Sequence, residues 1–234
     1  ALTSIFGLLC IWEFTKMIAF KSVISYIFFG LTVFLFFKRP ESYGITGILI
    51  ITLFSSVYLI YQLYAKKEIV YRNDRSKLGM TIRYVIFSVS FLVLIPFYKE
   101  EYQPYLILNI LVLIWVNDSF AFLVGKNFGK RKLFESVSPK KTIEGFLGGL
   151  IFSLIAAFLI SNYVTIFSPL NWMIISVIVS SFGTIGDLIE SKFKRQAGIK
   201  DSGNIMPGHG GMLDRLDSLL FVAPFVYLYI NFII

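Results

Sequence analysis

Hydrophobic residues in this chain come in long runs that are separated by short polar connections. A helix needs roughly 20 mostly apolar residues to cross the hydrocarbon core of a membrane. A membrane β-strand would instead alternate between apolar and polar positions over roughly ten residues. Segments 33–37 and 110–116 are apolar at every consecutive position. The pattern therefore predicts an all-α, polytopic integral membrane protein.

The lengths of these runs predict about eight transmembrane helices. They are expected at about residues 1–14, 22–37, 44–64, 80–98, 103–125, 145–161, 170–190 and 216–234. No internal repeat or soluble domain interrupts them, so we expect one membrane domain over residues 1–234, with N-terminal helices in 1–109 and the longer polar loops in 110–234. The chain starts at Ala1 and not at Met, so its first apolar run is expected to be the end of a longer helix.

The composition agrees with this class of protein. Hydrophobic residues make up 56% of the chain, against roughly 45–50% in soluble domains, and charged residues 15%, against about 25%. The mean hydropathy is +0.75. These values argue against a soluble enzyme, a disulfide scaffold and a disordered tail. Cys10 is the single cysteine of the sequence, so neither an internal disulfide nor a cysteine-based metal site is expected.

Lysine and arginine are distributed unevenly among the polar connections. Four connections hold 18 of the 22 basic residues, and they cover residues 15–21, 65–79, 126–141 and 191–215. With eight spans, all four connections lie on the same side of the membrane. The positive-inside rule makes that side cytoplasmic and puts both chain ends on the opposite side.

Acidic residues inside or beside the apolar runs are candidates for chemistry, because a charge at the bilayer centre costs about 2.5–3.5 kcal/mol. Asp118 lies inside the predicted span 103–125, where it would serve as an outer metal ligand or as the partner of a lysine. Glu13 precedes Lys16 by three residues, which places both on one helical face. We interpret Glu13 and Lys16 as a local ion pair.

Three aspartates near two predicted span ends suggest a metal site. Asp214 and Asp217 are three residues apart and share a helical face, and antiparallel packing of the last two spans would bring Asp187 to the same depth. Three carboxylates so close would repel one another unless a cation lay among them, and their hard oxygen ligands favour Mg²⁺. Helix capping is the alternative for Asp214 and Asp217, because a helix N-terminus favours anions.

A glycine-rich turn and two groups of basic residues lie next to these aspartates. Pro207, Gly210 and Gly211 surround His209, the only histidine in the sequence, and the backbone N–H groups of such a turn can approach a phosphate closely. The neighbouring cations are Lys194, Arg195 and Arg215, and an earlier loop carries Lys140 and Lys141. In that loop, Ser138 and Pro139 are interpreted as a helix start, and the two lysines either flank a span or bind an anion at its N-terminus.

Residues 191–217 resemble the signature of the phosphatidate cytidylyltransferase family, the CDP-diacylglycerol synthases. The matching residues are Ser191, Phe193, Lys194, Arg195, Lys200, Asp201, Gly203, Pro207, His209, Gly210, Gly211, Met212, Asp214, Arg215, Leu216 and Asp217. Met206 departs from the family pattern, which has Leu, Ile or Phe at its position. Weaker features extend the resemblance over about residues 110–234, which are then expected to hold the catalytic helices.

The resemblance implies transfer of CMP from CTP to phosphatidate, giving CDP-diacylglycerol and pyrophosphate in phospholipid biosynthesis. It also implies Mg²⁺, with a second cation compatible, and a site on the cytoplasmic side of a bacterial plasma membrane. The lipid bilayer is the expected surrounding, nucleic acid is not an expected partner, and a homo-oligomer is compatible with the sequence. The expected catalytic residues are Asp187, Asp214, Asp217, Lys200, Arg215 and His209, of which the first three are the metal ligands. The expected substrate-binding residues are Lys140, Lys141, Ser191, Lys194, Arg195, Gly210, Gly211 and Asp118.

Two other functions compete with this interpretation. A cation-coupled secondary transporter would use intramembrane Asp118 and Asp187 to carry its ion, but the carboxylates gather toward one membrane face and not at the midplane. A polyprenol or dolichol kinase would also bring a nucleotide to a membrane lipid, but would transfer the terminal phosphoryl group. The pattern from His209 to Asp217 favours the cytidylyltransferase.

Overall fold

Helices build almost the whole protein in the computed structural model, which describes residues 2–38, 43–65, 67–99, 101–205 and 210–234. They are α1 (Leu2–Met17), α2 (Val23–Lys38), α3 (Tyr43–Tyr64), α4 (Asp74–Met80), the π-helical turn η1 (Thr81–Ile86), α5 (Phe87–Leu94), α6 (Pro104–Phe128), α7 (Ile143–Tyr163), α8 (Pro169–Gln196) and α9 (Leu213–Phe232). The predicted all-α class is confirmed.

The eight predicted spans each coincide with a helical segment, and α4, η1 and α5 together form one of them. Within the described ranges, five helices are long and apolar enough to cross a membrane: Tyr43–Tyr64, Asp74–Leu94, Pro104–Phe128, Ile143–Tyr163 and Pro169–Gln196. The apolar helix α2 is shorter. The polytopic membrane class is therefore supported by length and composition, and the number of eight crossings stays a prediction.

Two short antiparallel hairpins accompany the helices. One pairs β1 (Phe97–Tyr98) with β2 (Glu101–Tyr102), and the other pairs β3 (Lys132–Phe134) with β4 (Ser138–Thr142). The interpretation of Ser138 and Pro139 as a helix start is wrong, because both lie in β4. Helix α7 begins after the hairpin, where the hydroxyl of Thr142 caps it by accepting a hydrogen bond from Gly145 N at 3.1 Å.

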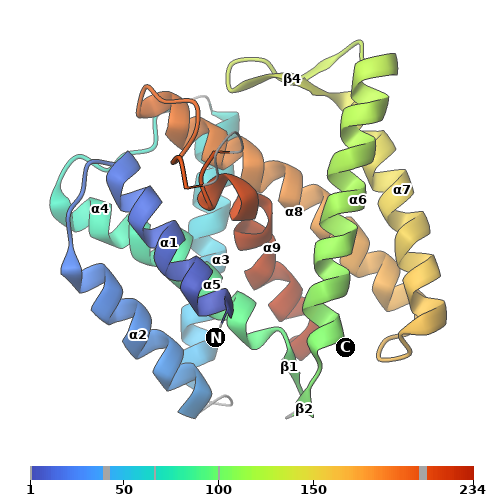
Figure 1. Ribbon diagram of the computed structural model, residues 1–234, viewed down its shortest axis with the longest axis horizontal. Helices are drawn as coiled ribbons and strands as arrows, with labels where there is room; N and C mark the ends of the chain where they lie inside the picture. Colours follow the sequence, from blue (N-terminus) through green and yellow to red (C-terminus); the bar gives the residue numbers. More distant parts are fainter. Residues whose placement is uncertain (1, 39–42, 66, 100, 206–209) are drawn as a thin grey trace.

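The helices pack in the order α6, α7, α8 and α9, with α1, α2 and α5 on the far side of α9 (Figure 1). Glycines set the close approach of α6 and α7. A Cβ atom on Gly145 would lie 2.6 Å from the Ala121 carbonyl oxygen, and one on Gly149 would lie 2.6 Å from the Asn117 carbonyl oxygen. Membrane helices use such small residues to bring their backbones together. The hydrophobic effect does not drive helices together in lipid, so close van der Waals packing contributes much of their association.

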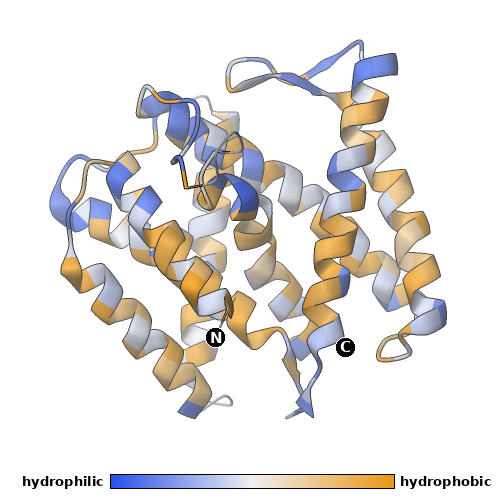
Figure 2. Cartoon of the chain, in the orientation of Figure 1, coloured by the Kyte–Doolittle hydropathy of each residue, from blue (hydrophilic) through white to orange (hydrophobic). Residues whose placement is uncertain are grey.

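Polar residues gather at one end of the helical bundle. Figure 2 shows hydrophilic segments in the β3–β4 hairpin and in the connection between α8 and α9, whereas the helices below them are mostly hydrophobic. Both chain ends lie at the opposite end of the bundle, near the β1–β2 hairpin (Figure 1). The fold thus brings the two basic connections, 126–141 and 191–215, to one polar end.

Candidate active site

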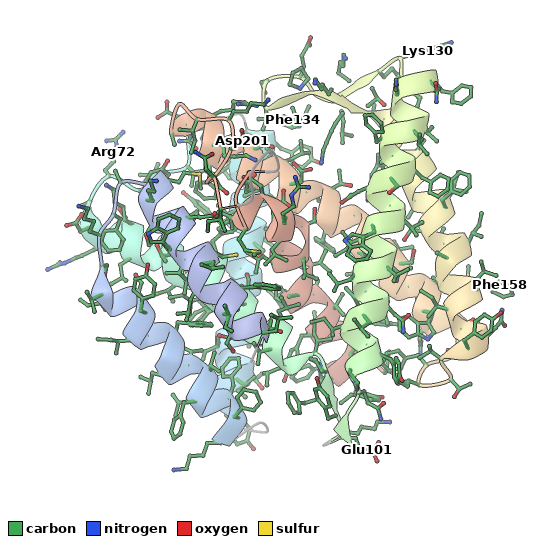
Figure 3. The ribbon with its side chains drawn as sticks, in the orientation of Figure 1. Arg72, Glu101, Lys130, Phe134, Phe158 and Asp201 are labelled. Carbon is green, nitrogen blue, oxygen red and sulfur yellow. The ribbon has the colours of Figure 1, made fainter. Side chains whose placement is uncertain are left out.

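The polar end assembles charged side chains from four parts of the fold: α6, strand β4, the last turns of α8, and the first turns of α9. The loop between α8 and α9, marked by Asp201 in Figure 3, and the β3–β4 hairpin, marked by Phe134, frame this region. The ring of Phe134 packs edge-on against Tyr64 of α3, with 5.8 Å between the ring centroids. At the base of the hairpin, Glu144 accepts hydrogen bonds from the backbone N–H groups of Lys130 and Arg131. The hairpin is therefore held at both ends.

Lys141 of β4 reaches the end of α8. Its Nζ lies 2.6 Å from Asp187 Oδ2, and the hydroxyl of Ser191 donates to Asp187 Oδ1 at 3.2 Å. Side chains alternate along a strand, and the neighbouring Lys140 is exposed. The structure thus joins three of the predicted site residues, Lys141, Asp187 and Ser191, and it leaves Lys140 outside this contact.

The ammonium group of Lys141 also acts electrostatically on two further carboxylates. Asp118 of α6 accepts a hydrogen bond from the Asn117 amide at 3.2 Å and is attracted by Lys141 and repelled by Asp187. Asp217 of α9 is buried, is repelled by Asp187 and is attracted by Lys141. Carboxylates from three helices therefore lie in the electrostatic field of one lysine, whose ion pair is with Asp187, and the two roles of Asp118 stay predictions.

Asp214, in the first turn of α9, holds the loop that precedes it. Its Oδ2 accepts hydrogen bonds from Gly211 N at 2.7 Å and from Ser202 N at 2.8 Å, and its Oδ1 lies 2.7 Å from Lys194 Nζ. Burial raises the pKa of Asp214, but the hydrogen bonds from Lys194 and the two backbone groups outweigh this effect and bring the pKa below its usual value. Gly210 has a φ of 84°, which suits glycine and lets the chain turn over this carboxylate.

Lys194 joins the two carboxylates on either side of it. Besides Asp214, its Nζ lies 2.5 Å from Glu190 Oε2, and Glu190 is completely buried one turn earlier in α8. Glu190 is also repelled by Asp217 and Asp214. A buried carboxylate in this position requires the lysine, because an uncompensated charge away from water is costly.

The predicted pair of Glu13 and Lys16 is wrong. Glu13 is completely buried and accepts hydrogen bonds from Met212 N at 3.0 Å and Leu213 N at 2.7 Å, at the start of α9. Lys16 turns away and places its Nζ 5.2 Å from the ring centroid of Trp12. Their spacing permits a pair on an isolated helix, but the unsatisfied N–H groups of another helix compete for the same carboxylate.

The three predicted metal ligands do not form a closed group. Among the described residues, no three histidine, cysteine or acidic side chains are grouped so that they could hold a metal ion. Asp187 is paired with Lys141 and Asp214 with Lys194. Two ammonium groups thus lie where the sequence suggested a cation.

The remaining predicted residues lie around the loop. Lys200 and Arg215 are exposed, and the exposed Arg195 donates to the Ile199 carbonyl at 3.3 Å. His209 lies outside the described residues. The sequence analysis missed Glu13 and Ser202 as parts of this site. A signal existed only for Glu13, because it is an acidic residue within an apolar run.

Comparison with known proteins identifies related chains. The sequence profile of the cytidylyltransferase family matches residues 1–233, well beyond the region 110–234 that carried the resemblance. The phosphatidate cytidylyltransferase of Bacillus subtilis (strain 168) is 47% identical over 129 residues, which are 55% of this chain and 48% of that protein. Those of Staphylococcus saprophyticus and Staphylococcus aureus (strain COL) are 42% identical over 172 and 173 residues, 73% of this chain and 64% of each relative. The matches thus span from about half to just under two thirds of the length of these relatives.

Proposed function

Because this chain belongs to the cytidylyltransferase family, we propose that it is a nucleotidyltransferase that forms CDP-diacylglycerol and pyrophosphate from CTP and phosphatidate. The observation that carries this proposal is the group of carboxylates and lysines at the polar end: Asp187 with Lys141, and Asp214 with Lys194. The related proteins are named phosphatidate cytidylyltransferases, which supports phosphatidate as the lipid substrate. Such a group suits two anionic substrates that must be held together beside a membrane.

The main requirement of this reaction is that the protein positions CTP and phosphatidate relative to each other. An oxygen of the phosphatidate phosphate attacks the α-phosphorus of CTP, and the bond from that phosphorus to the oxygen bridging the β-phosphate breaks, so pyrophosphate leaves with the electron pair. The attacking oxygen is already anionic at neutral pH, so no strong general base is needed. The protein must overcome the mutual repulsion of the substrates and align them, which is catalysis by proximity and electrostatics.

Lys141 and Lys194 are the cations best placed for this task. Each contacts a carboxylate, at 2.6 Å for Asp187 and 2.7 Å for Asp214, and each ends a flexible side chain. We infer that these ammonium groups turn from the carboxylates to phosphate oxygens when the substrates bind. Arg195 at the end of α8, Lys200 in the loop and Arg215 at the start of α9 are exposed and then add positive charge.

We propose that Asp187, Asp214 and Asp217 hold Mg²⁺ once the two lysines have moved. Their carboxylate oxygens are the hard ligands that Mg²⁺ takes, and the lysines that now neutralise two of them indicate that this place favours positive charge. When bound, Mg²⁺ would neutralise the triphosphate and the developing charge on pyrophosphate. A second cation is compatible with the Glu190 carboxyl group, whose Oε2 lies 2.5 Å from Lys194 Nζ.

A conversion assay tests the proposed reaction. Purified protein incubated with CTP, phosphatidate and Mg²⁺ is expected to produce lipid-linked CMP and one pyrophosphate for each lipid converted. With a polyprenol added as a second acceptor, formation of CDP and a phosphorylated polyprenol would instead identify a kinase. Uptake of a cation into proteoliposomes without any nucleotide turnover would identify a transporter.

The active site is proposed to face the cytoplasm of a bacterial cell, from the plasma membrane. The bacterial relatives and the 18 basic residues of the four connections support this orientation. A cysteine introduced at exposed Asn204 should react with an impermeant reagent only from the cytoplasmic side, and one at exposed Thr165 only from outside. Natural Cys10 is buried and gives little background. Labelling of both positions from one side would contradict the proposed orientation.

Lys141 and Lys140 form a matched pair for a test of substrate binding. Replacing Lys141 by Ala is expected to lower kcat/KM by about 10- to 100-fold, since a charge-assisted hydrogen bond contributes about 1.5–3 kcal/mol. The change should affect CTP and phosphatidate alike and leave the preference for CTP over ATP intact, because the proposed contacts are to phosphates. Replacing the exposed Lys140 should have a much smaller effect. Steady-state kinetics with both nucleotides measure this, and a switch in nucleotide preference would place Lys141 elsewhere.

A further inference from the structure

Glu13 connects the first helix of the chain to the candidate active site. It lies in α1, 199 residues before Met212, and its side chain is completely buried. It has no basic partner among the ion pairs of the described residues. A buried carboxylate is costly unless hydrogen-bond donors surround it, so its contacts indicate what it does.

Within the described residues, these contacts are to the start of α9 and to the loop before it. Glu13 Oε1 accepts from Met212 N at 3.0 Å, and Oε2 accepts from Leu213 N at 2.7 Å. Met212 occupies the N-cap position of α9 and provides no side-chain cap. Glu13 therefore satisfies N–H groups that a helix leaves open, and its negative charge suits the positive end of the helix dipole.

Ser202 links Glu13 to Asp214. Its hydroxyl oxygen lies 3.1 Å from Glu13 Oε2 and 2.9 Å from Asp214 Oδ2, and its backbone N–H donates to the same Asp214 oxygen. A hydroxyl has one proton to donate, so the two carboxylates share it. Hydrogen bonds to both Glu13 and Asp214 therefore hold Ser202 in place.

Two glycines of the loop lie so close to the Glu13 carboxylate that a side chain at either position would collide with it. A Cβ atom on Gly211 would lie 2.5 Å from both Glu13 oxygens, and one on Gly203 would overlap Oε1. Both positions belong to the segment 191–217 that resembles the family signature. The small residues there leave the space that a carboxylate from α1 fills.

We propose that Glu13 is a positioning residue of the active site, which fixes Ser202, Gly211 and the first turn of α9 so that Asp214 and Asp217 stand opposite Lys194 and Asp187. For the reaction it positions, this inference rests on the proposed function. Its consequence is that α1 is part of the catalytic unit. A displacement of about 1 Å at reacting groups can cost about 100-fold in rate, so a helix that touches no substrate still affects turnover.

The test replaces Glu13 by Gln in the full chain. The amide has nearly the same size, but its NH₂ group would face a backbone N–H or the Ser202 hydroxyl in place of an acceptor. We expect kcat/KM to fall by roughly 10- to 100-fold, while the amount of membrane-inserted protein stays the same. Thr15→Val is the matched control, because the buried Thr15 hydroxyl bonds to Ile11 O within α1. Its kcat/KM should stay at the wild-type level.

Limited trypsin digestion of inverted membrane vesicles separates a positioning role from a general loss of structure. The Gln variant should be cleaved faster after Lys200, in the loop, and at the wild-type rate after exposed Arg72, between α3 and α4. Equal acceleration at both sites, or wild-type kcat/KM together with wild-type cleavage, would overturn the inference. Should the Gln variant not accumulate, Ser202→Ala removes one of the contacts to Glu13 and is expected to show the same effects to a smaller extent.

The digestion needs no substrate, so its result does not depend on whether the proposed reaction is correct. If wild-type protein makes no CDP-diacylglycerol but loss of Glu13 still loosens the loop at Lys200, the proposed function fails and the structural role of Glu13 holds. If wild-type protein is active and the Glu13 variant behaves like it in both assays, the proposed function holds and the positioning role fails.

Discussion

Replacing Asp217 by Asn is expected to lower turnover of CTP and phosphatidate by about 100- to 1,000-fold, the range seen when one preorganised electrostatic group is removed from an active site. Asp217 is buried beside Asp187 and within the field of Lys141, and its Oδ1 accepts from Ser218 N at 2.6 Å. Asparagine keeps the volume and one acceptor oxygen but removes the charge. The proposed cation would then lose a ligand, and Lys141 would be held too strongly by Asp187 to reach a phosphate.

The same exchange at Asp74 is the control for Asp217→Asn. Asp74 is exposed in the first turn of α4, so Asp74→Asn should leave turnover unchanged. Initial rates with both substrates, at equal amounts of inserted protein, give the comparison. If Asp217→Asn stays active, or if wild-type activity is indifferent to chelation of Mg²⁺, the assignment of Asp217 as a metal ligand is wrong even though the family is right.

Replacing Gly186 by Ala is expected to lower stability by about 1–3 kcal/mol, the usual cost of overpacking, and activity by about 100-fold. Gly186 lies next to Asp187 where α8 meets α9. A Cβ atom there would be 2.5 Å from the Phe221 Cβ and 3.0 Å from the Asp217 carbonyl oxygen. These atoms belong to a helix, so relief requires α9 to move away, and Asp217 would move with it.

Gly47 provides the matched control for Gly186→Ala, because a Cβ atom there meets nothing within 4 Å. Gly47→Ala in α3 should leave activity unchanged and stability equal or slightly higher, since alanine favours a helix over glycine. Thermal inactivation of detergent-solubilised protein and the conversion assay measure the two effects. Wild-type stability of the Gly186→Ala variant would show that α8 and α9 are not in close contact where Gly186 faces Phe221.

Part of the site was predictable because its residues are close together in the sequence. Asp187 and Ser191 are four residues apart on one helix, which already placed them on the same face, and the loop up to Asp217 carries fixed spacings. The sequence indicates Lys140 and Lys141 as candidates, but it does not predict their different surroundings. They depend on the strand β4, where neighbouring side chains point to opposite sides, and the sequence was interpreted there as a helix start.

The network around Glu13 was beyond prediction from the sequence. Glu13 and Lys16 have the spacing of a helical ion pair, and nothing local indicates that N–H groups 199 residues later would take the carboxylate. The same holds for Asp214, whose place in the sequence is compatible with helix capping and with metal binding. In the structure it bonds to Ser202, Gly211 and Lys194, a combination that depends on how the loop folds back over α9.

The sequence by itself determined the all-α membrane class, the positions of the helical segments and the signature of the family. These features are local, because the length of an apolar run reflects the solvent around it and the signature is a set of spacings along one segment. Only the tertiary structure decided that α1 supports the start of α9 through Glu13, and that Lys141 and Lys194 now neutralise Asp187 and Asp214. Buried charges and open helix ends must find partners wherever the packing of helices brings them, and that packing joins residues that are distant in the sequence.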